Sequence, residues 1–321
     1  MELRATVPTR QDDDALIDLL GSMEEVDHRG EVWSPADIDD EWASVWSHPA
    51  TDARFVWDGG ELVGFAWLRA MPGEREANKV GCWGGVRPSH RRRGLGSELL
   101  EWSLARGGAI ATGFHNGLPT KAELDAPDRQ RDLLTIAAGC GFEPARRFLE
   151  VARPTSAPVP PAPAPSGLEL VSWSEALDEE ARSAHRESFA DHWGSEPRSK
   201  EEWRQWYTGH RSFRPDLSRL AVDPASGRVE ALVLSSAYPP DWQRGPVEAW
   251  IQVVGTRRAS RGKGVARWLL SDVLRRIAEA DTGFERAILG VDAENPTGAL
   301  GLYRSLGFED VRSVHTLTRA L

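Results

Sequence analysis

The clearest hydrophobic period in the chain lies at residues 263–280, where Val265, Leu269, Val273 and Ile277 recur at four-residue spacing opposite a charged face. This spacing predicts an amphipathic helix whose apolar face packs on a sheet. Strands that alternate with helices predict an α/β (α+β) domain of three layers, with helices flanking a central sheet. The strand-forming runs that suggest this sheet are 79–86, 247–256 and 287–291.

The same order of elements occurs twice along the chain. Each half has a strand and an acidic helix, a second helix with two tryptophans, a hairpin, an apolar strand, an Arg/Gly loop and a closing Gly-Phe pair. The matching segments are 2–20 and 168–189, Trp42/Trp46 and Trp203/Trp206, the turns at 58–61 and 223–228, and Gly141-Phe142 and Gly307-Phe308. A repeat of about 170 residues indicates an internal duplication.

Residues 153–167 (RPTSAPVPPAPAPSG) separate the two halves. Repeated prolines remove backbone donors and favour an extended conformation, so we expect a semi-rigid linker that takes no part in a core. A chain of 321 residues is long enough for two domains of common size. The sequence therefore predicts an N-terminal domain at 1–152, this linker, and a C-terminal domain at 168–321.

The composition narrows the class of protein. Hydrophobic residues make up 40% and charged residues 27%, which is typical of a soluble globular protein, and the net charge of -10 disfavours nucleic acid as a partner. Cys82 and Cys140 are too few for a disulfide framework and lack the spacing of metal ligands. The first residues show no signal peptide, and no run approaches the roughly 18 apolar residues of a membrane span. We expect a cytoplasmic monomer or homodimer that holds no metal and contacts no membrane.

The Arg/Gly loop of the C-terminal half, Arg261-Gly262-Lys263-Gly264-Val265-Ala266, joins a strand to the predicted helix. Glycines allow a tight turn, the start of a helix presents unpaired N–H groups, and the two cations suit a phosphate. The N-terminal half repeats the arrangement at Arg91-Arg92-Arg93-Gly94-Leu95-Gly96. A turn that only connects strand and helix explains either loop equally well. The sequence lacks the Gly-Lys-Ser/Thr ending of a nucleotide P-loop and the third glycine of a dinucleotide-binding fold.

A second motif follows in the C-terminal half. The strand at 287–291 leads to Asn295-Pro296, where proline is expected at the first position of a helix, and then to Tyr303 and the Gly307-Phe308 pair. With the loop before it, this segment resembles the GNAT acetyltransferase family, which pairs an Arg/Gln-x-x-Gly-x-Gly/Ala loop with a later Asn…Tyr-x-x-x-Gly-Phe segment. The resemblance implies two tandem GNAT domains, each with a mixed, largely antiparallel twisted sheet flanked by helices.

The resemblance also implies that the C-terminal half binds acetyl-CoA. In that family the loop holds the pyrophosphate and the strand before it pairs with the pantetheine arm, and an N–H near Val254 would stabilise the thioester oxygen. The implied cofactor-binding residues are Val254, Gly255, Thr256, Arg261, Gly262, Lys263, Gly264, Val265, Ala266 and Asn295. Tyr303 would protonate the leaving thiolate. The competing explanation for Tyr303 is an aromatic anchor between its helix and the sheet.

Attack on a thioester needs a neutral amine, so a base or a water relay must remove a proton. Glu248 lies on the strand before the loop, where this family often places a carboxylate. An exposed glutamate without a catalytic role is an equally good explanation of that residue. Asp292 and Glu294 are weaker candidates for the base.

The N-terminal half departs from the family pattern. Counting back from Gly141-Phe142, the tyrosine position is Ala137, and Asn116 lies well upstream of the position that would match Asn295. The residues of this half implied to contact CoA are Gly84, Gly85, Val86, Arg91, Arg92, Arg93, Gly94, Leu95 and Gly96. We expect a copy that binds the cofactor or serves the structure, without catalysis.

The family resemblance places the acceptor pocket at the first two helices of the C-terminal half and the loop between them. Trp193, Trp203 and Trp206 fall there, and they could form the wall of a pocket for a sugar, an aromatic amine or a cation. Tryptophans three or four residues apart on a helix more often pack onto a core, which is the competing explanation. His185 and His192 are expected to be hydrogen-bonded rather than catalytic.

The sequence therefore predicts an acetyl-CoA-dependent N-acetyltransferase that acts on a primary amine of a small molecule or a peptide, with its active site in the C-terminal half. The layout is similar to that of the mycothiol synthases, tandem family members with a weak first half, so acetylation of a thiol-sugar amine is an alternative. A CoA-binding sensor or scaffold without catalysis is another alternative. The presence of both Asn295 and Tyr303 argues against such a sensor.

Overall fold

The computed structural model describes residues 3–295 and 298–321 of the chain. The chain forms two compact units, of which unit 1 contains residues 1–147 and 313–321 and unit 2 contains residues 148–312. Both units have the predicted α/β architecture, in which a mixed sheet carries helices on its two faces. Each unit is described separately below.

The sheet of unit 1 has the strand order β1-β2-β3-β4-β5-β12. Neighbouring strands are antiparallel except β4 and β5, which are parallel. The strand bounds are β1 Leu3–Thr6, β2 Ala53–Asp58, β3 Glu61–Met71, β4 Asn78–Val86, β5 Thr120–Pro127 and β12 Glu309–Ala320. The hairpin turn predicted at 58–61 joins β2 to β3 and is confirmed.

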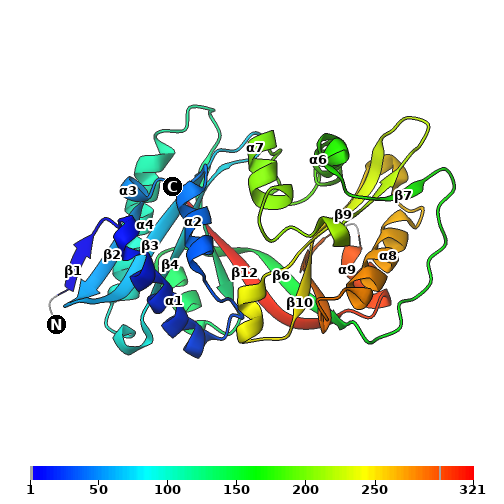
Figure 1. Cartoon of the computed structure of the whole chain (residues 1–321). Coiled ribbons are helices and arrows are strands. Elements are labelled where there is room, and N and C mark those ends of the chain that lie inside the picture. The colour runs from blue at the N-terminus through cyan, green and yellow to red at the C-terminus, as the bar shows by residue number, and fades with distance from the viewer. Residues whose placement is uncertain (1–2, 296–297) are drawn as a thin grey trace. The chain divides into compact units, whose positions relative to one another are not determined.

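The helices of unit 1 cover both faces of its sheet. On one face the apolar side of α1 packs on aromatic side chains of β2 and β3, including Phe55, Phe65 and Trp67. On the other face Leu95 and Leu99 of α4 pack on β2 and β3, and both helices can be followed in Figure 1. The helix bounds are α1 Asp13–Asp27, α2 Pro35–Ala43, α3 Pro49–Asp52, α4 Leu95–Ala111 and α5 Arg131–Gly139.

The sheet of unit 2 repeats this topology in the order β6-β11-β10-β9-β8-β7. Strands β10 and β11 are the parallel pair, in the place that β4 and β5 take in unit 1, and the other neighbours are antiparallel. The strand bounds are β6 Glu143–Pro154, β7 Glu169–Ser172, β8 Arg219–Val222, β9 Val229–Ser236, β10 Glu248–Thr256 and β11 Arg286–Asp292. The duplication inferred from the sequence is therefore also present in the strand order.

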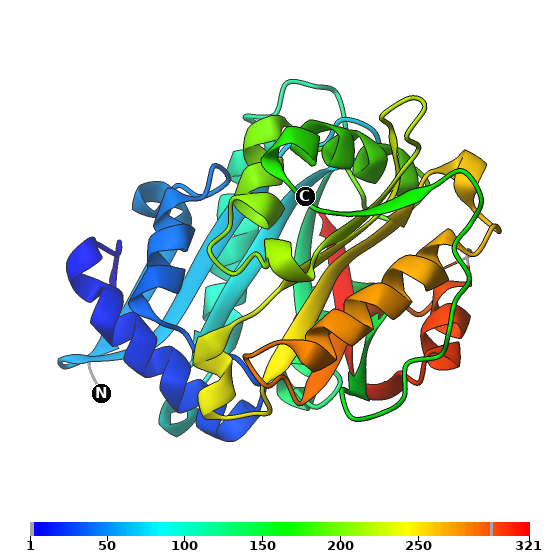
Figure 2. The same ribbon diagram turned by 45° about the vertical axis from the view of Figure 1, so that its right-hand side comes forward.

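The amphipathic helix predicted at 263–280 is α8, drawn in orange in Figure 2, and it packs against β8, β9 and β10 of unit 2. Its apolar face forms the largest core of the unit together with α9, and helices α6 and α7 pack on the opposite face around Trp203 and Leu232. The helix bounds are α6 Asp178–Ser188, α7 Lys200–Trp203 with a π-helical turn at Arg204–Thr208, α8 Val265–Glu279 and α9 Ala299–Ser305.

The last strand of each sequence half belongs to the other half's unit. Residues 148–154 of β6 pair with β11 in unit 2, and residues 314–320 of β12 pair with β5 in unit 1. The compact units therefore differ from the domain bounds expected at 1–152 and 168–321. Strand pairing between segments so far apart along the chain leaves no local signal in the sequence, because both final strands carry the same alternating pattern.

The proline-rich stretch packs more closely than a free linker would. Arg153 and Pro154 are the end of β6, and Arg153 is 1% exposed. Beyond them, the side chain of Val159 packs against the core of unit 2 and Ser271 Oγ donates a hydrogen bond to the carbonyl of Pro160. Prolines do lack backbone donors, but their carbonyls still accept bonds, and this is how the segment is fixed to unit 2.

Two local expectations from the sequence need correction. Trp42 lies in α2, but Trp46 follows the end of that helix, because Ser47 forms a bridge with Arg69 of β3 and draws the chain onto the sheet. The helix with Tyr303 begins at Ala299. The start expected at Pro296 lies outside the described residues.

Candidate active site

Strands β10 and β11 pair only over their first three residues. The pairs are Glu248 with Arg286, Ala249 with Ala287 and Trp250 with Ile288, whereas β11 pairs with β6 on its other side along its whole length. Residues Ile251–Thr256 of β10 therefore have no partner from β11, and we call this segment the β10 edge. An unpaired strand edge presents N–H and C=O groups to which an extended ligand can bind as an added strand.

A β-bulge distorts β10 at the beginning of this edge. The register with β9 shifts between Ile251 and Val253, so that Gln252 is an extra residue. Bulges re-aim the backbone groups and side chains beside them and are often found next to active sites. The corresponding strand of unit 1 lacks this feature, since the register of β4 with β3 runs unbroken from Lys79 to Val86.

The Arg/Gly loop joins the β10 edge to the start of α8. Gly264 is the N-cap of α8 and has φ +79°, a left-handed conformation that glycine adopts at little cost. As a glycine it offers no side-chain oxygen to the first amides of the helix, and the first turn of α8 holds no acidic residue. The N–H groups of this turn and the positive end of the helix dipole therefore favour a bound anion.

The side chain of Arg261 fixes the loop to the backbone of β10 and α6. Its Nε donates to the carbonyl of Thr256 at 3.2 Å and its Nη2 donates to the carbonyl of Ser188 at 2.8 Å. The guanidinium is thus committed to the backbone of β10 and α6, whereas the side chain of Lys263 is exposed. The sequence pointed to both cations as phosphate ligands, and this geometry favours the backbone amides and Lys263 for that task.

The end of α6 lies directly on the β10 edge. A side chain at Gly255 would come within 3.2 Å of Cβ of Ser188 and 2.7 Å of Cδ2 of Leu232, so a larger residue there requires these side chains to shift. The hydroxyl of Ser188 is buried, and in the described part of the chain it has no hydrogen-bond partner. Sequence analysis missed this serine, because nothing local marks the residue that a helix places against a distant strand.

Tyr303 lies on α9 and belongs to the same core as Val265 of α8 and Val291 of β11. The residue is 6% exposed, and burial raises the pKa of its hydroxyl above the ordinary value for tyrosine. No described residue forms a hydrogen bond with this hydroxyl. Tyr303 therefore keeps its proton over the whole physiological pH range and has an uncommitted donor.

Asn295 follows the carboxyl end of β11, where its N–H donates to the carbonyl of Asp292 at 3.1 Å. Asp292 is 3% exposed, and its Oδ1 accepts the N–H of Glu294 at 2.9 Å. The side chain of Asp292 is thus part of the turn that follows β11. The positions fit the predicted role of Asn295 at the start of this segment.

Glu248 is poorly placed for the base suggested by the sequence. It is the first residue of β10 and forms an ion pair with Arg286, its partner in the parallel register. Six residues of strand separate it from Val254, which corresponds to about 20 Å. A carboxylate that neutralises an arginine at the far end of a strand is explained by that ion pair alone.

The loop of unit 1 has the same backbone plan with more negative charge around it. Arg91 donates to the carbonyl of Val86 and forms two bonds of 2.7 Å with Asp27. Arg92 pairs with Asp132 at 2.9 Å, and the first turn of α4 contains Glu98. Beside the loop of unit 2, Asp191 likewise pairs with Arg258 and Arg261, so the difference between the loops is Glu98 in the first turn of α4, which disfavours an anion there.

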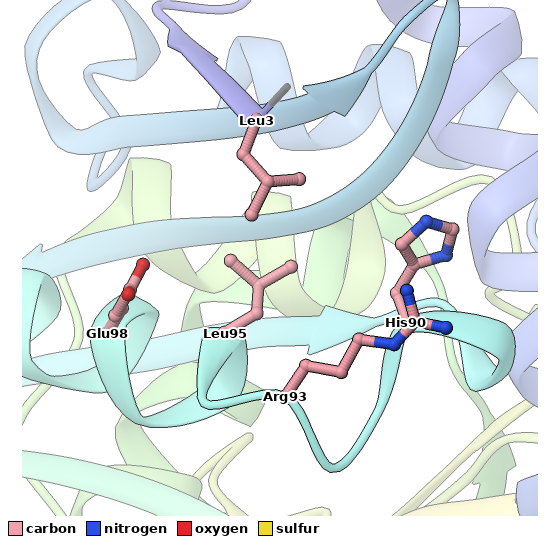
Figure 3. A pocket seen from close by; sticks show the side chains of 5 residues that line it. All are labelled: Leu3, His90, Arg93, Leu95 and Glu98. Carbon is pink, nitrogen blue, oxygen red and sulfur yellow. The ribbon is translucent and has the colours of Figure 1, made fainter. Parts of the chain in front are cut away.

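Figure 3 shows a small pocket at this loop in unit 1, lined by Leu3, His90, Arg93, Leu95 and Glu98. The guanidinium of Arg93 donates to the carbonyl of Ser89 at 3.0 Å, and the ring of His90 lies 3.3 Å from the carboxylate of Asp58. The lining therefore contains both signs of charge.

Ala137 and Tyr303 occupy equivalent places in the two units. The carbonyl of Ala137 accepts the N–H of Phe142 at 3.0 Å, and the carbonyl of Tyr303 accepts the N–H of Phe308 at 3.1 Å. Gly141 and Gly307 both have φ near +80° at the ends of these helices. The alignment by the Gly-Phe pairs thus holds in three dimensions, and unit 1 has a methyl group where unit 2 has the phenol.

Aromatic side chains fill one face of β4, in a different core from that of Ala137. Trp83 stacks on Trp33 with ring centroids 4.7 Å apart and contacts the edge of Phe65 at 4.8 Å. Counted back from the loop glycine, the equivalent of Trp83 in unit 2 is the smaller Val253. The tryptophan-rich composition is explained here by core packing in unit 1.

The three tryptophans proposed for the acceptor pocket differ in their surroundings. Trp203 is fully buried and its Nε1 donates to Asp178 at 2.9 Å, so it is a core residue and the pocket hypothesis is wrong for it. Trp206 is 45% exposed, with the guanidinium of Arg198 5.0 Å from its ring. Trp193 is half-buried, 6.5 Å from Phe148 of β6. An aromatic acceptor wall is thus possible only with Trp193 and Trp206.

The histidines of this region have structural partners. His185 stacks on Phe189 at 4.5 Å and lies close to Trp203 and Tyr207. Burial, with a smaller effect from the positive charge of Arg198, lowers the pKa of His185 to about 3, so the ring is neutral at physiological pH. Nδ1 of His192 lies 3.1 Å from the carbonyl of Trp193.

Comparison with known proteins identifies the family. The model of the "Acetyltransferase (GNAT) family" matches residues 15–123 and 175–308, which cover most of both sequence halves. The chain belongs to the GNAT acetyltransferase family. This membership confirms the resemblance inferred from the two motifs, and it confirms the predicted tandem fold and enzyme class.

Named relatives share most of the chain. A mycothiol acetyltransferase of Thermobispora bispora is 32% identical over 265 residues, covering 80% of each chain. A mycothiol acetyltransferase of Saccharomonospora viridis is 29% identical over 305 residues, covering 92% of this chain and 91% of the relative. These GNAT enzymes span both halves and the segment between them.

Two solved structures have a fold similar to that of this chain over nearly its full length. A GCN5-related N-acetyltransferase from Sphaerobacter thermophilus has a TM-score of 0.74 at 25% identity, with 99% of this chain and 95% of that chain covered. A tandem GNAT protein from the clavulanic acid biosynthesis pathway has a TM-score of 0.71 at 17% identity, with 99% and 98% covered. The second likeness concerns the fold alone.

The described residues of this GNAT chain contain no helix with the length and apolar character needed to cross a membrane. In the same residues, histidine, cysteine and acidic side chains form no group of three or more that would suit a metal ion.

Proposed function

We propose that the C-terminal half transfers an acetyl group from acetyl-CoA to a primary amine of a small molecule or a peptide. The observation that carries this proposal is the combination of an open β10 edge with an uncapped start of α8 in one unit. Unit 2 also has the phenol that unit 1 lacks. The cytoplasm is the compartment expected from the sequence.

The β10 edge and the start of α8 fit the two ends of a CoA molecule. The amides and carbonyls of Ile251–Thr256 can pair with the peptide-like pantetheine arm, and the first N–H groups of α8 with Lys263 can hold the diphosphate. Asn295 would contact the cofactor from the end of β11. The thioester of acetyl-CoA supplies the activated acetyl group.

Tyr303 supplies the proton for the departing thiolate in this proposal. Its hydroxyl is uncommitted among the described residues, and its raised pKa keeps it protonated at neutral pH. An acid that gives up its proton only in the transition state accelerates such reactions by about 10²- to 10⁴-fold. The amide near Val254, re-aimed by the bulge at Gln252, would stabilise the thioester oxygen.

The amine must lose a proton when it attacks, and the structure favours a water relay for this step over Glu248. Glu248 is held by Arg286, and Asp292 and Glu294 take part in the turn after β11. A bulk-water route requires that the amine be partly deprotonated before it binds. The rate is then expected to rise with pH until the acceptor's own pKa is passed.

A thiol-sugar amine of the mycothiol type is the second candidate acceptor. The relatives named mycothiol acetyltransferase favour it, since two of them are 32% and 31% identical over most of the chain. In unit 2, Trp193 and Trp206 supply accessible aromatic surface of the kind that sugars contact. The two proposals differ only in the part of the acceptor that lies against this aromatic surface, which in the second proposal is a sugar.

The N-terminal copy is proposed to be non-catalytic. It has Ala137 at the tyrosine position, no bulge in β4, and carboxylates around its loop. Any CoA bound at Gly84–Val86 and Arg91–Gly96 is expected to stay unreacted. Arg92→Ala should therefore leave most of the transfer activity.

Release of free thiol from acetyl-CoA tests the proposal. The full chain is assayed with amino sugars, aromatic amines, short peptides and a thiol-sugar amine, each with and without Tyr303→Phe. Turnover with at least one amine that depends on Tyr303 supports the proposal. Binding of acetyl-CoA without thiol release from any acceptor would instead establish the sensor alternative.

A further inference from the structure

A buried arginine at the end of β6, where the proline-rich segment begins, holds the end of the helix with Tyr303. Arg153 lies on β6 and is 1% exposed. Its Nε donates to the carbonyl of Leu306 at 2.6 Å, and its Nη2 donates to the carbonyls of Ala157 and Pro158 at 2.8 and 2.7 Å. All of these residues belong to unit 2.

Two hydrogen bonds connect this guanidinium to Tyr303. Leu306, whose carbonyl Arg153 holds, donates its N–H to the carbonyl of Tyr303 at 2.9 Å. Helix α9 has seven residues, and a helix of that length has little stability of its own in water. Its position therefore depends on contacts at its ends, and a cation at its C-terminus also suits the negative end of the helix dipole.

Arg319 makes the corresponding contact in unit 1. It lies on β12, and its Nη1 donates to the carbonyl of Cys140 at the end of α5 at 2.5 Å. Arg319 is exposed, whereas Arg153 is buried and bonded to three carbonyls. The helix end held by Arg319 has Ala137 in place of the tyrosine, so this arginine has no phenol to position.

We propose that Arg153 is a positioning residue for Tyr303, so that the end of β6, where the proline-rich segment begins, completes the catalytic site of unit 2. The planar fork of arginine reaches carbonyls in several directions at once, which a lysine ammonium cannot do with the same geometry. The carbonyls of Ala157 and Pro158 fix the fork from the side opposite α9. Loss of the fork then frees the end of α9 and with it the phenol.

The kinetic consequence rests on the proposed acid role of Tyr303, but the positioning itself can be measured separately. The chain has three tyrosines, Tyr207, Tyr238 and Tyr303, so ¹³Cζ-labelled tyrosine gives three NMR signals, assigned by Tyr303→Phe. Arg153→Lys should shift the signal of Tyr303 and leave the other two, and the matched variant Arg319→Lys should leave all three. An unshifted Tyr303 signal in folded Arg153→Lys would overturn the proposal.

Thiol release with the best acceptor of the amine panel gives the second reading. Displacement of a catalytic group by a fraction of an ångström to 1 Å costs on the order of 10- to 100-fold in rate, so Arg153→Lys should lower kcat by about that factor with little change in KM for acetyl-CoA. In the Tyr303→Phe background the same substitution should change kcat less than about twofold, because interacting residues are not additive. Equal losses in both backgrounds would show a general structural role and overturn the proposal.

The NMR signal of Tyr303 and the rate of thiol release together distinguish a failure of this inference from a failure of the proposed function. A shifted Tyr303 signal together with full transfer activity in Tyr303→Phe would leave Arg153 as the positioning residue and remove Tyr303 as the acid. Arg153→Gln, which removes the charge, should have the larger effect if it folds. Arg153→Lys retains the charge and provides the test if it does not.

Discussion

At the scale of single residues, the proposed chemistry depends on the environment of one phenol. Tyr303 is packed among apolar side chains of α8, α9 and β11, and burial alone accounts for its raised pKa. A tyrosine that served only as an anchor would gain stability by bonding its hydroxyl, and the described residues offer it no partner. The hydroxyl is therefore poised to donate to a ligand atom.

Tyr303→Phe is expected to lower kcat for acetyl transfer by about 100-fold, because the leaving thiolate loses its proton donor. Affinity for CoA, measured by calorimetry, should change little. Tyr207→Phe is the matched control, since Tyr207 belongs to the aromatic group around His185. Full activity in Tyr303→Phe would contradict the acid role.

His185 links stability to pH. Its pKa lies below the unfolded value of 6.5, so below pH 6.5 the unfolded chain binds the proton first and stability falls until the folded pKa of about 3 is passed. Between pH 7 and pH 5 this one group should lower the free energy of unfolding by about 2 kcal/mol. Urea unfolding followed by fluorescence at both pH values measures the effect.

His185→Phe should reduce this loss, because phenylalanine fills the aromatic cluster without a titrating group. The exposed His115 provides the control, and His115→Phe should keep the wild-type pH dependence. The explanation fails if His185→Phe and the wild type lose the same stability between the two pH values.

At the scale of elements, the two Arg/Gly loops have the same backbone conformation but different charged residues around them. Both helices begin at a left-handed glycine, Gly94 or Gly264, without a side-chain cap. The start of α4 has Glu98 and the Arg92–Asp132 pair beside it, whereas the first turn of α8 is free of acids. Anion affinity should therefore concentrate at α8.

Charge reversal at equivalent loop positions tests this difference. Lys263→Glu should weaken binding of CoA by about tenfold, since a cation next to the diphosphate becomes an anion. Arg93→Glu at the matching position of unit 1 should change the affinity for the functional site less than about twofold. Calorimetric titration of each variant with CoA gives both values, and a larger effect from Arg93→Glu would place the main site in unit 1.

Periodicity and motif spacing predicted most of the elements and both loops from the sequence. Helix α8, the two hairpins and the equivalence of Ala137 with Tyr303 followed from local patterns, and the structure has them in place. The bulge at Gln252 was not predicted, because one extra residue in an apolar run looks like ordinary strand. The proximity of Ser188 to Gly255 was also hidden, since it depends on how a helix docks on a strand.

At the scale of the whole molecule, the two halves depend on each other through their last strands. Strand β6 supplies residues 148–154 to the sheet of unit 2, and β12 supplies residues 314–320 to the sheet of unit 1. The sequence suggested self-contained halves, because a proline-rich segment usually marks a domain boundary. If the N-terminal copy is non-catalytic as proposed, the exchange gives a reason to retain it, since its last strand belongs to the sheet of unit 2.

Core substitutions in the exchanged strands should act on the unit that receives the strand. Leu149→Ala on β6 removes a buried side chain opposite Val291 of β11, and Leu317→Ala on β12 removes one opposite Leu124 of β5. Each is expected to cost about 2–5 kcal/mol. Hydrogen exchange read by mass spectrometry should show the loss of protection in β11 for Leu149→Ala and in β5 for Leu317→Ala.

The reverse pattern of hydrogen-exchange protection would contradict the exchange of last strands between the two units. If Leu149→Ala loosened β5 and left β11 protected, β6 would belong to unit 1 in solution. Protection lost equally in both units by either variant would also be inconsistent with two separate compact units.

The most direct test of the account is a crystal structure of the full chain with CoA bound. The account predicts electron density for the diphosphate at the N–H groups of Val265 and Ala266, pantetheine paired with the β10 edge, and the CoA sulfur within hydrogen-bond distance of the hydroxyl of Tyr303. Density for CoA only at the start of α4, or a sulfur beyond the reach of that hydroxyl, would contradict it.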